Sequence, residues 1–433
     1  MSRNRMMVAL AMLGVCMMVW ADVSVYDVKI QPRTPWNGLV DISYSVACDN
    51  PNADVYVTPT AYDGDRRITL FPKTLSGDGA EATVKPGKHT MTWDAKKDLG
   101  IFSSAKFSMK IHAGERLPRY VVIDLSSGAE STEYPVRFSV VGPDISNDIC
   151  RTTELWLRLV SPGEFWMGSP TDELGRSDNE TLHHVTFTQP FYIGVFEVTQ
   201  RQFELVMGGT GNSYFRSSAN HAIRPVENTD LGKIRGGDVP SAKTGFDSSS
   251  FISKLRIRTK NWGLDLPSES QWEYACRAGT MTALPNGKNL TDTTSSCELS
   301  EIAAYYANCH GDQGYDGNSI MVGTQQVGNF QPNALNLYDM LGNVREICRD
   351  NSHVWSADDC VDPNPVDVQL SNNNGSSHWR YYVIRGGGWR STAGNVRSSR
   401  RDAWEGWSRD GNKISWYASD DQTGFRIFAE TGF

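Results

Sequence analysis

Two acidic side chains, Asp339 and Glu346, stand seven residues apart within residues 331–350, with Gly342 between them. The apolar residues of this stretch keep no helical or strand period for long, which indicates a tightly folded loop. A turn at the glycine would let both carboxylates and the intervening carbonyls point at one place, and Ca²⁺ prefers such an oxygen shell. Alternatively, Asp339 caps a short helix and Glu346 pairs with an arginine, and spacing alone favours this second interpretation.

The same stretch resembles the LYD-M-x-GNV-W-E-W signature of the formylglycine-generating enzyme family, also called the sulfatase-modifying factor family. The likeness extends from about residue 155 to residue 428, with six motifs in the family's order. The other matching segments are residues 164–169, 191–193 with 197–199, 225–227, 266–275, 385–389 and 424–426. A likeness of this kind is specific to a fold and does not by itself establish an activity.

The resemblance implies an α+β fold, an atypical C-type-lectin-like arrangement that is poor in regular structure. It also implies structural calcium. The implied ligands are Asp339, Gly342, Val344 and Glu346, the middle two through backbone oxygens, with Asn308 as the first ligand of a second calcium site. The later ligands of that second site fall where the alignment slips, and Asp316 is a guess there.

The family's catalytic machinery is missing from the matching positions. Active members use two cysteines, five residues apart and just after RGGSW, to bind copper and oxidise a substrate cysteine to formylglycine. Those positions are Ser391 and Val396 here, and no cysteine follows Cys360. Gly388 also replaces the serine of RGGSW. Because monovalent copper needs thiolate ligands, we expect neither a copper site nor catalytic residues at these positions.

Arginines and tryptophans gather beside these positions, in residues 389–407. Guanidinium and indole groups together suit recognition of a carboxylate, a sulfate or a sugar. Equally, the arginines pair with neighbouring acids and the tryptophans fill the core, and the sequence does not choose between the two. The candidate pocket residues are Trp389, Arg390, Arg397, Arg400 and Trp404.

Length and composition indicate an ordinary globular protein of two or three domains. The chain has 433 residues, of which 21% are charged and 39% hydrophobic. The formal net charge of −8 predicts no nucleic-acid partner, since that would need a basic face.

Residues 1–21 form the one strongly apolar stretch, with Arg3 and Arg5 ahead of an uncharged run that ends in Ala21. This pattern predicts a cleaved signal peptide, a secreted or periplasmic protein, and no membrane span after cleavage. A retained anchor or a lipoprotein signal at Cys16 fits the pattern less well. In an oxidising compartment local disulfides are plausible, and we predict the pairs Cys297 with Cys309 and Cys348 with Cys360.

Residues 22–113 alternate apolar and polar side chains, as in Val40, Ile42, Tyr44 and Val46, which predicts a small β-sandwich. Residues 87–94 resemble one strand of bacterial immunoglobulin-like modules, so we expect an immunoglobulin-like spacer or adhesion domain. Residues 114–150 read as a linking hairpin that packs on one neighbour or the other. Residues 151–433 form the family domain, with capping boxes predicted to begin helices at Thr199 and Ser268.

Two functions follow from these observations. The first is an exported, non-catalytic module that binds an unknown protein, peptide or glycan ligand, with calcium as structural support. The alternative is an oxidoreductase of the family that converts a cysteine of an exported sulfatase to formylglycine. The absent cysteines favour the first.

Overall fold

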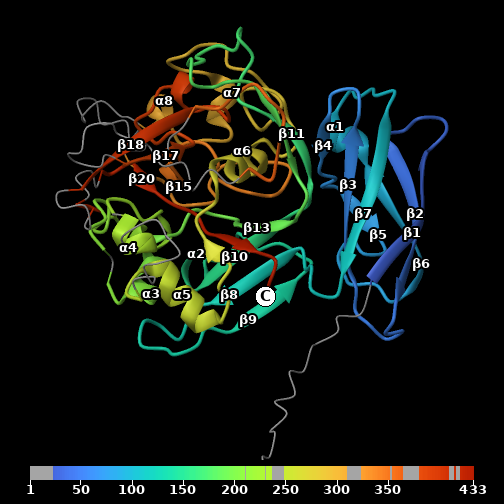
Figure 1. Ribbon diagram of the computed structural model, residues 1–433, viewed down its shortest axis with the longest axis horizontal. Helices are drawn as coiled ribbons and strands as arrows, with labels where there is room; N and C mark the ends of the chain where they lie inside the picture. Colours follow the sequence, from blue (N-terminus) through green and yellow to red (C-terminus); the bar gives the residue numbers. More distant parts are fainter. Residues whose placement is uncertain are drawn as a thin grey trace, which may run out of the picture.

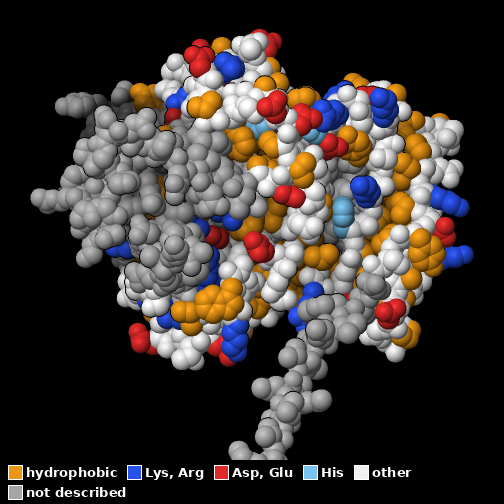
Figure 2. Space-filling view, in the orientation of Figure 1, with side chains coloured by type: hydrophobic (Ala, Val, Ile, Leu, Met, Phe, Trp, Pro, Cys, Tyr) orange, Lys and Arg blue, Asp and Glu red, His pale blue; other side chains and the backbone are white. Residues whose placement is uncertain are grey.

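The computed structural model describes residues 23–209, 211–229, 231–236, 248–309, 323–351, 354–363, 380–408, 414–415 and 420–433. A smaller part made mainly of strands is followed by a larger mixed part (Figure 1). The predicted signal peptide lies outside the described residues. Within these ranges no helix is both long and apolar enough to cross a membrane. On the face shown in Figure 2, acidic and basic side chains are interspersed.

The smaller part consists of two sheets that share one apolar core. The first, in spatial order, comprises β1 (Val23–Pro32), β2 (Leu39–Cys48), β6 (Gly87–Asp94) and β5 (Leu75–Gly77), and the second β4 (Ile68–Leu70), β3 (Tyr56–Asp63) and β7 (Phe107–Gly114). The short helix α1 (Ala95–Leu99) follows β6. The predicted alternation is confirmed in β2, where Val40, Ile42, Tyr44 and Val46 are all buried. The immunoglobulin-like topology stays a prediction.

A six-stranded sheet forms one side of the larger part. In order it comprises β14 (Leu264–Asp265), β21 (Phe428–Glu430), β13 (Phe191–Gly194), β10 (Glu154–Val160), β8 (Tyr120–Asp124) and β9 (Val136–Ser139). The hairpin of residues 114–150 therefore joins the larger part, because β8 pairs along β10. Burial of apolar side chains explains why β8 packs on the larger part, since Val121 and Ile123 are fully buried there.

Two further sheets complete the larger part. One comprises β11 (Gly163–Met167), β12 (His183–Phe187) and β16 (Cys360–Val361), and the other β19 (Ile414–Ser415), β18 (Arg401–Ser408), β17 (Arg380–Arg385), β15 (Arg345–Asn351) and β20 (Thr423–Gly424). The predicted disulfides are wrong, because the seven described cysteines are all free. Cys348 is buried in β15 whereas Cys360 lies in β16 of another sheet, and Cys297 is exposed whereas Cys309 is buried.

The helices are short, so the chain is a strand-rich α+β protein. They are α2 (Ile149–Thr152), α3 (Gln200–Met207), α4 (Leu231–Arg235), α5 (Phe251–Thr259), α6 (Glu269–Arg277), α7 (Cys297–Ser300) and α8 (Tyr306–Cys309), with 3-10 turns at His221–Ile223 and Ala393–Asn395. Both predicted capping boxes are confirmed, with Thr199 bonded to Gln202 before α3 and Ser268 bonded to Gln271 before α6.

The two parts are packed firmly against each other. Phe71, which follows β4 of the smaller part, belongs to the apolar core of the larger part and lies edge-on to Tyr274, with ring centroids 5.7 Å apart. The Glu164 N–H donates to Thr69 Oγ1 (3.0 Å), and Arg119 donates to the carbonyls of Gly79 and Ala80. The smaller part is therefore not a loosely tethered spacer.

Candidate functional site

The segment from Asp339 to Glu346 is a tight loop that leads into β15. Asp339, Gly342 and Asn343 all have positive φ, at 52°, 77° and 57°. A Cβ on Gly342 would lie 2.2 Å from the Ala304 carbonyl oxygen, so only glycine fits there. The Asn343 N–H also donates to the Ala304 carbonyl (2.7 Å), which fixes this loop against the chain before α8.

The Glu346 carboxylate is paired with an arginine. Arg426 donates from Nη2 to Oε1 (2.6 Å) and from Nε to Oε2 (2.7 Å) of Glu346, and the indole N–H of Trp272 donates to Oε2 (2.7 Å). The sequence left open that Glu346 pairs with an arginine instead of binding calcium, and the structure has this pair. Arg426 also donates to the Asp339 and Tyr338 carbonyls.

Two other buried carboxylates lie around the same guanidinium. Glu197 accepts from Asn343 Nδ2 (2.6 Å) and from the Val344 N–H (3.0 Å). Asp339 accepts the Gly328 N–H at Oδ2 (2.6 Å), whereas its buried Oδ1 has no hydrogen-bond partner among the described residues. Asp339 also lines a cavity of about 20 Å³, which is large enough for one water molecule.

Burial and mutual repulsion disfavour ionisation of this group. Burial raises the pKa of Glu197 well above its ordinary value, and the nearby charges of Asp339 and Glu346 raise it further. Burial likewise raises the pKa of Asp339, to about 6, against the opposing effects of the Gly328 N–H and Arg426. Because the three carboxylates lie around the Arg426 guanidinium in a buried site, a proton on one of them or an additional cation would relieve their repulsion.

Sequence reasoning identified only part of this cluster. It named Asp339 and Glu346 but gave no role to Glu197 or Arg426, although both lie in matched motifs. Asn308 is used locally, since its Oδ1 accepts the Tyr305 N–H and its Nδ2 donates to the Ala303 carbonyl, both at 2.8 Å. Asp316 lies outside the described residues. No group of three or more His, Cys, Asp or Glu side chains in the described ranges is arranged as a metal site.

The positions of the family's copper cysteines have other roles here. Ser391 Oγ accepts the Gly388 N–H (3.0 Å), and the Ser391 carbonyl accepts the Tyr306 N–H (3.0 Å). Val396 is fully buried in the apolar core of the larger part. Neither side chain is a copper ligand.

One thiol does lie close to this region. Cys309 belongs to a small apolar cluster with Trp389 and Ala304, against which Phe215 packs. Burial raises the pKa of the Cys309 thiol to about 12, so the thiol is neutral at physiological pH. Among the described cysteines, Cys309 alone belongs to this cluster.

Three of the five predicted pocket residues, Arg390, Arg397 and Arg400, are paired with acidic side chains. Arg397 is fully buried and paired with Glu180 (2.7 Å) and Glu173 (2.5 Å). Arg400 is paired with Asp402 (2.5 Å). Arg390 stacks over the Trp389 ring at 4.4 Å and pairs with Asp421 (2.6 Å), while the Trp404 side chain lies outside the described residues. Of the two roles that the sequence left open, Arg397 therefore has the structural one, in which an arginine pairs with acidic side chains.

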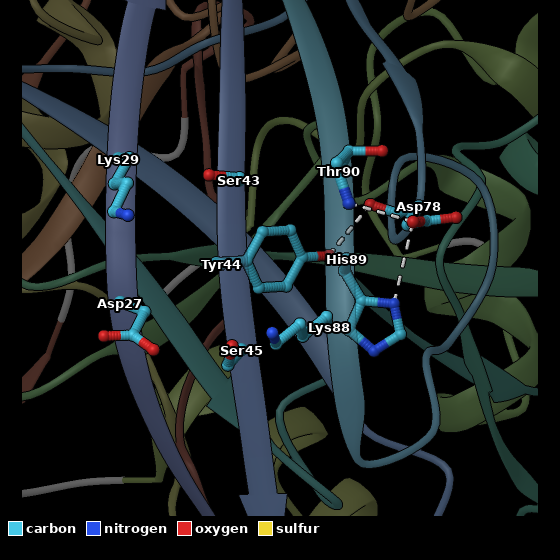
Figure 3. A pocket seen from close by; sticks show the side chains of 9 residues that line it. All are labelled: Asp27, Lys29, Ser43, Tyr44, Ser45, Asp78, Lys88, His89 and Thr90. Carbon is cyan, nitrogen blue, oxygen red and sulfur yellow. Dashed lines mark hydrogen bonds and ion pairs between the residues drawn. The ribbon is translucent and has the colours of Figure 1, made fainter.

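A larger cavity, of about 340 Å³, lies in the smaller part, on strands β1, β2 and β6 (Figure 3). No sequence motif pointed to it, because its lining is assembled by strand pairing. Its residues are Asp27, Lys29, Ser43, Tyr44, Ser45, Asp78, Lys88, His89 and Thr90.

Comparison with known proteins places the larger part in a family. Residues 149–430 match the model of the sulfatase-modifying factor enzyme 1-like domain. The chain is 28% identical to chaperone protein LppX of Paenibacillus barcinonensis, over 48% of this chain and 72% of LppX. It is 23% identical to the formylglycine-generating enzyme of Mus musculus, over 43% of this chain and 56% of that enzyme. It spans about a third of the length of other curated relatives.

Among solved structures, Treponema denticola variable protein 1 is similar at 23% identity. The match covers 64% of this chain and 96% of that one, with a TM-score of 0.43. The family match covers well over half of the chain and includes the loop, the buried carboxylates and the Ser391 and Val396 positions. The chain therefore belongs to the sulfatase-modifying factor enzyme 1-like family.

Proposed function

We propose that this chain is an exported, non-catalytic member of its family, a module that binds a protein, peptide or glycan and holds a structural calcium ion. The observation that carries the proposal is the chemistry at Ser391 and Val396. A hydroxyl that accepts a backbone N–H and a buried isopropyl group stand where the family resemblance implies copper-binding thiols. These side chains do not fit copper, so no oxidation step is derived through it.

A copper and oxygen assay tests this proposal. The purified protein, offered one equivalent of Cu(I) and a Cys-x-Pro-x-Arg peptide, should neither bind the metal tightly nor consume oxygen above background. The loss of copper ligands predicts this result. Tight binding of one Cu(I) with turnover of the peptide cysteine would overturn the non-catalytic assignment.

The alternative function, oxidation of a sulfatase cysteine to formylglycine, is supported by the placement of Cys309 beside Trp389. If the copper assay is positive, the variant Cys309→Ala shows whether this thiol is responsible. A variant that keeps full copper binding would exclude Cys309 as the ligand.

Calcium at the buried carboxylates fits the donor chemistry of the site. Within the described residues one carboxylate oxygen of Asp339 has no hydrogen-bond partner, and Arg426 lies among Glu197, Asp339 and Glu346. Asp339, together with the Gly342 and Val344 carbonyls, would hold the ion, whereas Glu346 is already paired with Arg426. When bound, calcium would supply the positive charge that the cluster lacks.

We expect 1 mM CaCl₂ to raise the melting temperature relative to EDTA. For a dissociation constant of about 10 μM the gain is roughly 2.7 kcal/mol, or several degrees for a domain of this size. Asp339→Asn, which tolerates the same positive φ, should remove the calcium response. Equal melting temperatures of the wild-type protein in CaCl₂ and EDTA would eliminate the calcium site.

A further inference from the structure

The cavity on the smaller part is a hollow in the exposed side of a β-sheet. Figure 3 shows its side chains on three neighbouring strands, β1, β2 and β6, with Asp78 reaching it from the turn after β5. In Figure 1 the three strands lie on the side of the smaller part away from the larger part. Its volume of about 340 Å³ is in the range of small-ligand sites. Its lining residues all precede the family domain, so the hollow is a different place from the buried carboxylates and from Ser391 and Val396, and the proposal names a ligand class for the binding module proposed above.

Strand register explains why the sheet is hollow here. Ser43 of the central strand β2 lies opposite Lys29 of β1 and Thr90 of β6, and Ser45 lies opposite Lys88 of β6. Residues directly opposite each other across strands share a face, so the two serines form a low floor between two long lysine side chains.

A β-bulge adds an acid to the wall of the hollow. The pairing of β1 with β2 shifts between Tyr26 and Lys29, and Asp27 has a φ of 53°. The extra residue breaks the alternation, so Tyr26 and Asp27 are both exposed. Tyr26, which is 50% exposed, pairs with Ser45 and therefore stands on the same face as the serine floor.

The charged side chains that line the hollow differ in the hydrogen bonds and ion pairs that they make. Asp78 accepts the Thr90 N–H (2.9 Å) and lies 3.7 Å from His89. In the described part of the chain, neither Lys29 nor Lys88 has a carboxylate within ion-pair distance, although both line the hollow. Two ammonium groups, serine and threonine hydroxyls and the Asp27 carboxylate are thus presented together with an exposed tyrosine ring.

We propose that this hollow binds an acidic saccharide, a glycan that carries uronic-acid carboxylates. The two lysines would bind its carboxylate, Asp27 would accept hydrogen bonds from its ring hydroxyls, and Tyr26 offers a flat apolar face for a sugar ring. A purely anionic ligand would be repelled by Asp27, and a neutral sugar would leave both lysines unpaired. The combination of groups therefore selects a ligand that has both hydroxyls and a negative charge.

Calorimetric titration of the full-length protein with trigalacturonic acid tests the proposal. We expect saturable binding, weakened at least about tenfold by Lys29→Met and by Lys88→Met, because each removes a charge-assisted hydrogen bond. Lys110→Met, which removes an exposed lysine from β7 on the other sheet, is the matched control and should leave the affinity unchanged.

Asp27→Asn separates a saccharide site from a simple basic patch. Asparagine tolerates the positive φ of this position, so the bulge should persist. Loss of the Asp27 acceptor should weaken trigalacturonate binding, whereas a basic patch would bind any anion more tightly once the acid is removed. Tighter binding by Asp27→Asn, no binding by the wild-type protein at millimolar saccharide, or equal binding of a penta-glutamate peptide would each overturn the proposal.

Discussion

Replacement of Arg397 by methionine should lower the free energy of unfolding by about 3–5 kcal/mol. The Arg397 guanidinium donates to both oxygens of Glu180 (2.7 and 2.9 Å), and it also pairs with Glu173 (2.5 Å). Removing the arginine leaves two buried carboxylates without their cation, which costs more than the pair itself contributes. Urea denaturation at pH 7 measures the change.

The pH dependence of the Arg397→Met effect provides a second check. Burial acts to raise the pKa of Glu180, but the hydrogen bonds and charge of Arg397 outweigh burial, so this pKa lies below its ordinary value. The stability from the pair is therefore present above the unfolded-state pKa of Glu and is lost as pH falls through the lower folded-state value. The deficit of the variant should shrink in acid.

Arg390→Met is the matched control for Arg397. The Arg390 side chain is 47% exposed, against a fully buried Arg397, and Asp421 is its single acidic partner among the described residues, so its loss should cost much less than that of Arg397. If Arg397→Met unfolds at the same urea concentration as Arg390→Met, the buried network is not what holds residues 173–180 against residues 397–401.

Replacement of Asp350 by asparagine should stabilise the protein at pH 8 and have little effect at pH 4. Asp350 is fully buried and accepts the Glu269 N–H at Oδ2 (2.5 Å), and in the part of the chain that the structure describes its Oδ1 has no hydrogen-bond partner. Burial raises its pKa from 3.8 to about 7, and the neighbouring Glu269 carboxylate adds to this effect.

The sign of the Asp350 effect follows from the raised pKa. The folded state holds the proton of Asp350 more tightly than the unfolded state does, so the contribution of Asp350 to stability is greatest below pH 3.8 and declines as pH rises to about 7. A shift of about three pH units corresponds to about 4 kcal/mol at pH 8. Asparagine carries no charge and avoids this cost.

Denaturation curves between pH 4 and pH 8 compare Asp350→Asn with the wild-type protein. The exposed Asp358→Asn, in the loop before β16, serves as the control and should change stability little at any pH. A variant Asp350→Asn that is less stable than the wild-type protein at pH 8 would show that the aspartate is ionised and favourably paired.

Local patterns predicted local structure well in this chain. Alternating side chains placed β2 correctly, and the capping boxes placed the starts of α3 and α6, because each depends on residues within one turn or strand. Such local patterns could not predict whether two cysteines lie close enough to form a disulfide. Cys360 lies only twelve positions after Cys348, yet the two cysteines belong to different sheets.

The candidate site was predicted only where its residues are near in sequence. Asp339 and Glu346 share one loop, whereas Glu197 joins them from 142 residues before Asp339 and Arg426 from 80 residues after Glu346. Arg397 was equally open to two interpretations, because nothing in its own neighbourhood shows that Glu173 and Glu180 lie beside it. The hollow on the smaller part depends on strand register and a bulge, which composition does not reveal.

The insertion of Phe71 into the core of the larger part has a mechanical consequence. A force applied to the smaller part would reach Tyr274 and α6 directly, because Phe71 packs against the Tyr274 ring. A ligand held in the hollow on β1, β2 and β6 would therefore keep a defined orientation relative to α6 of the larger part.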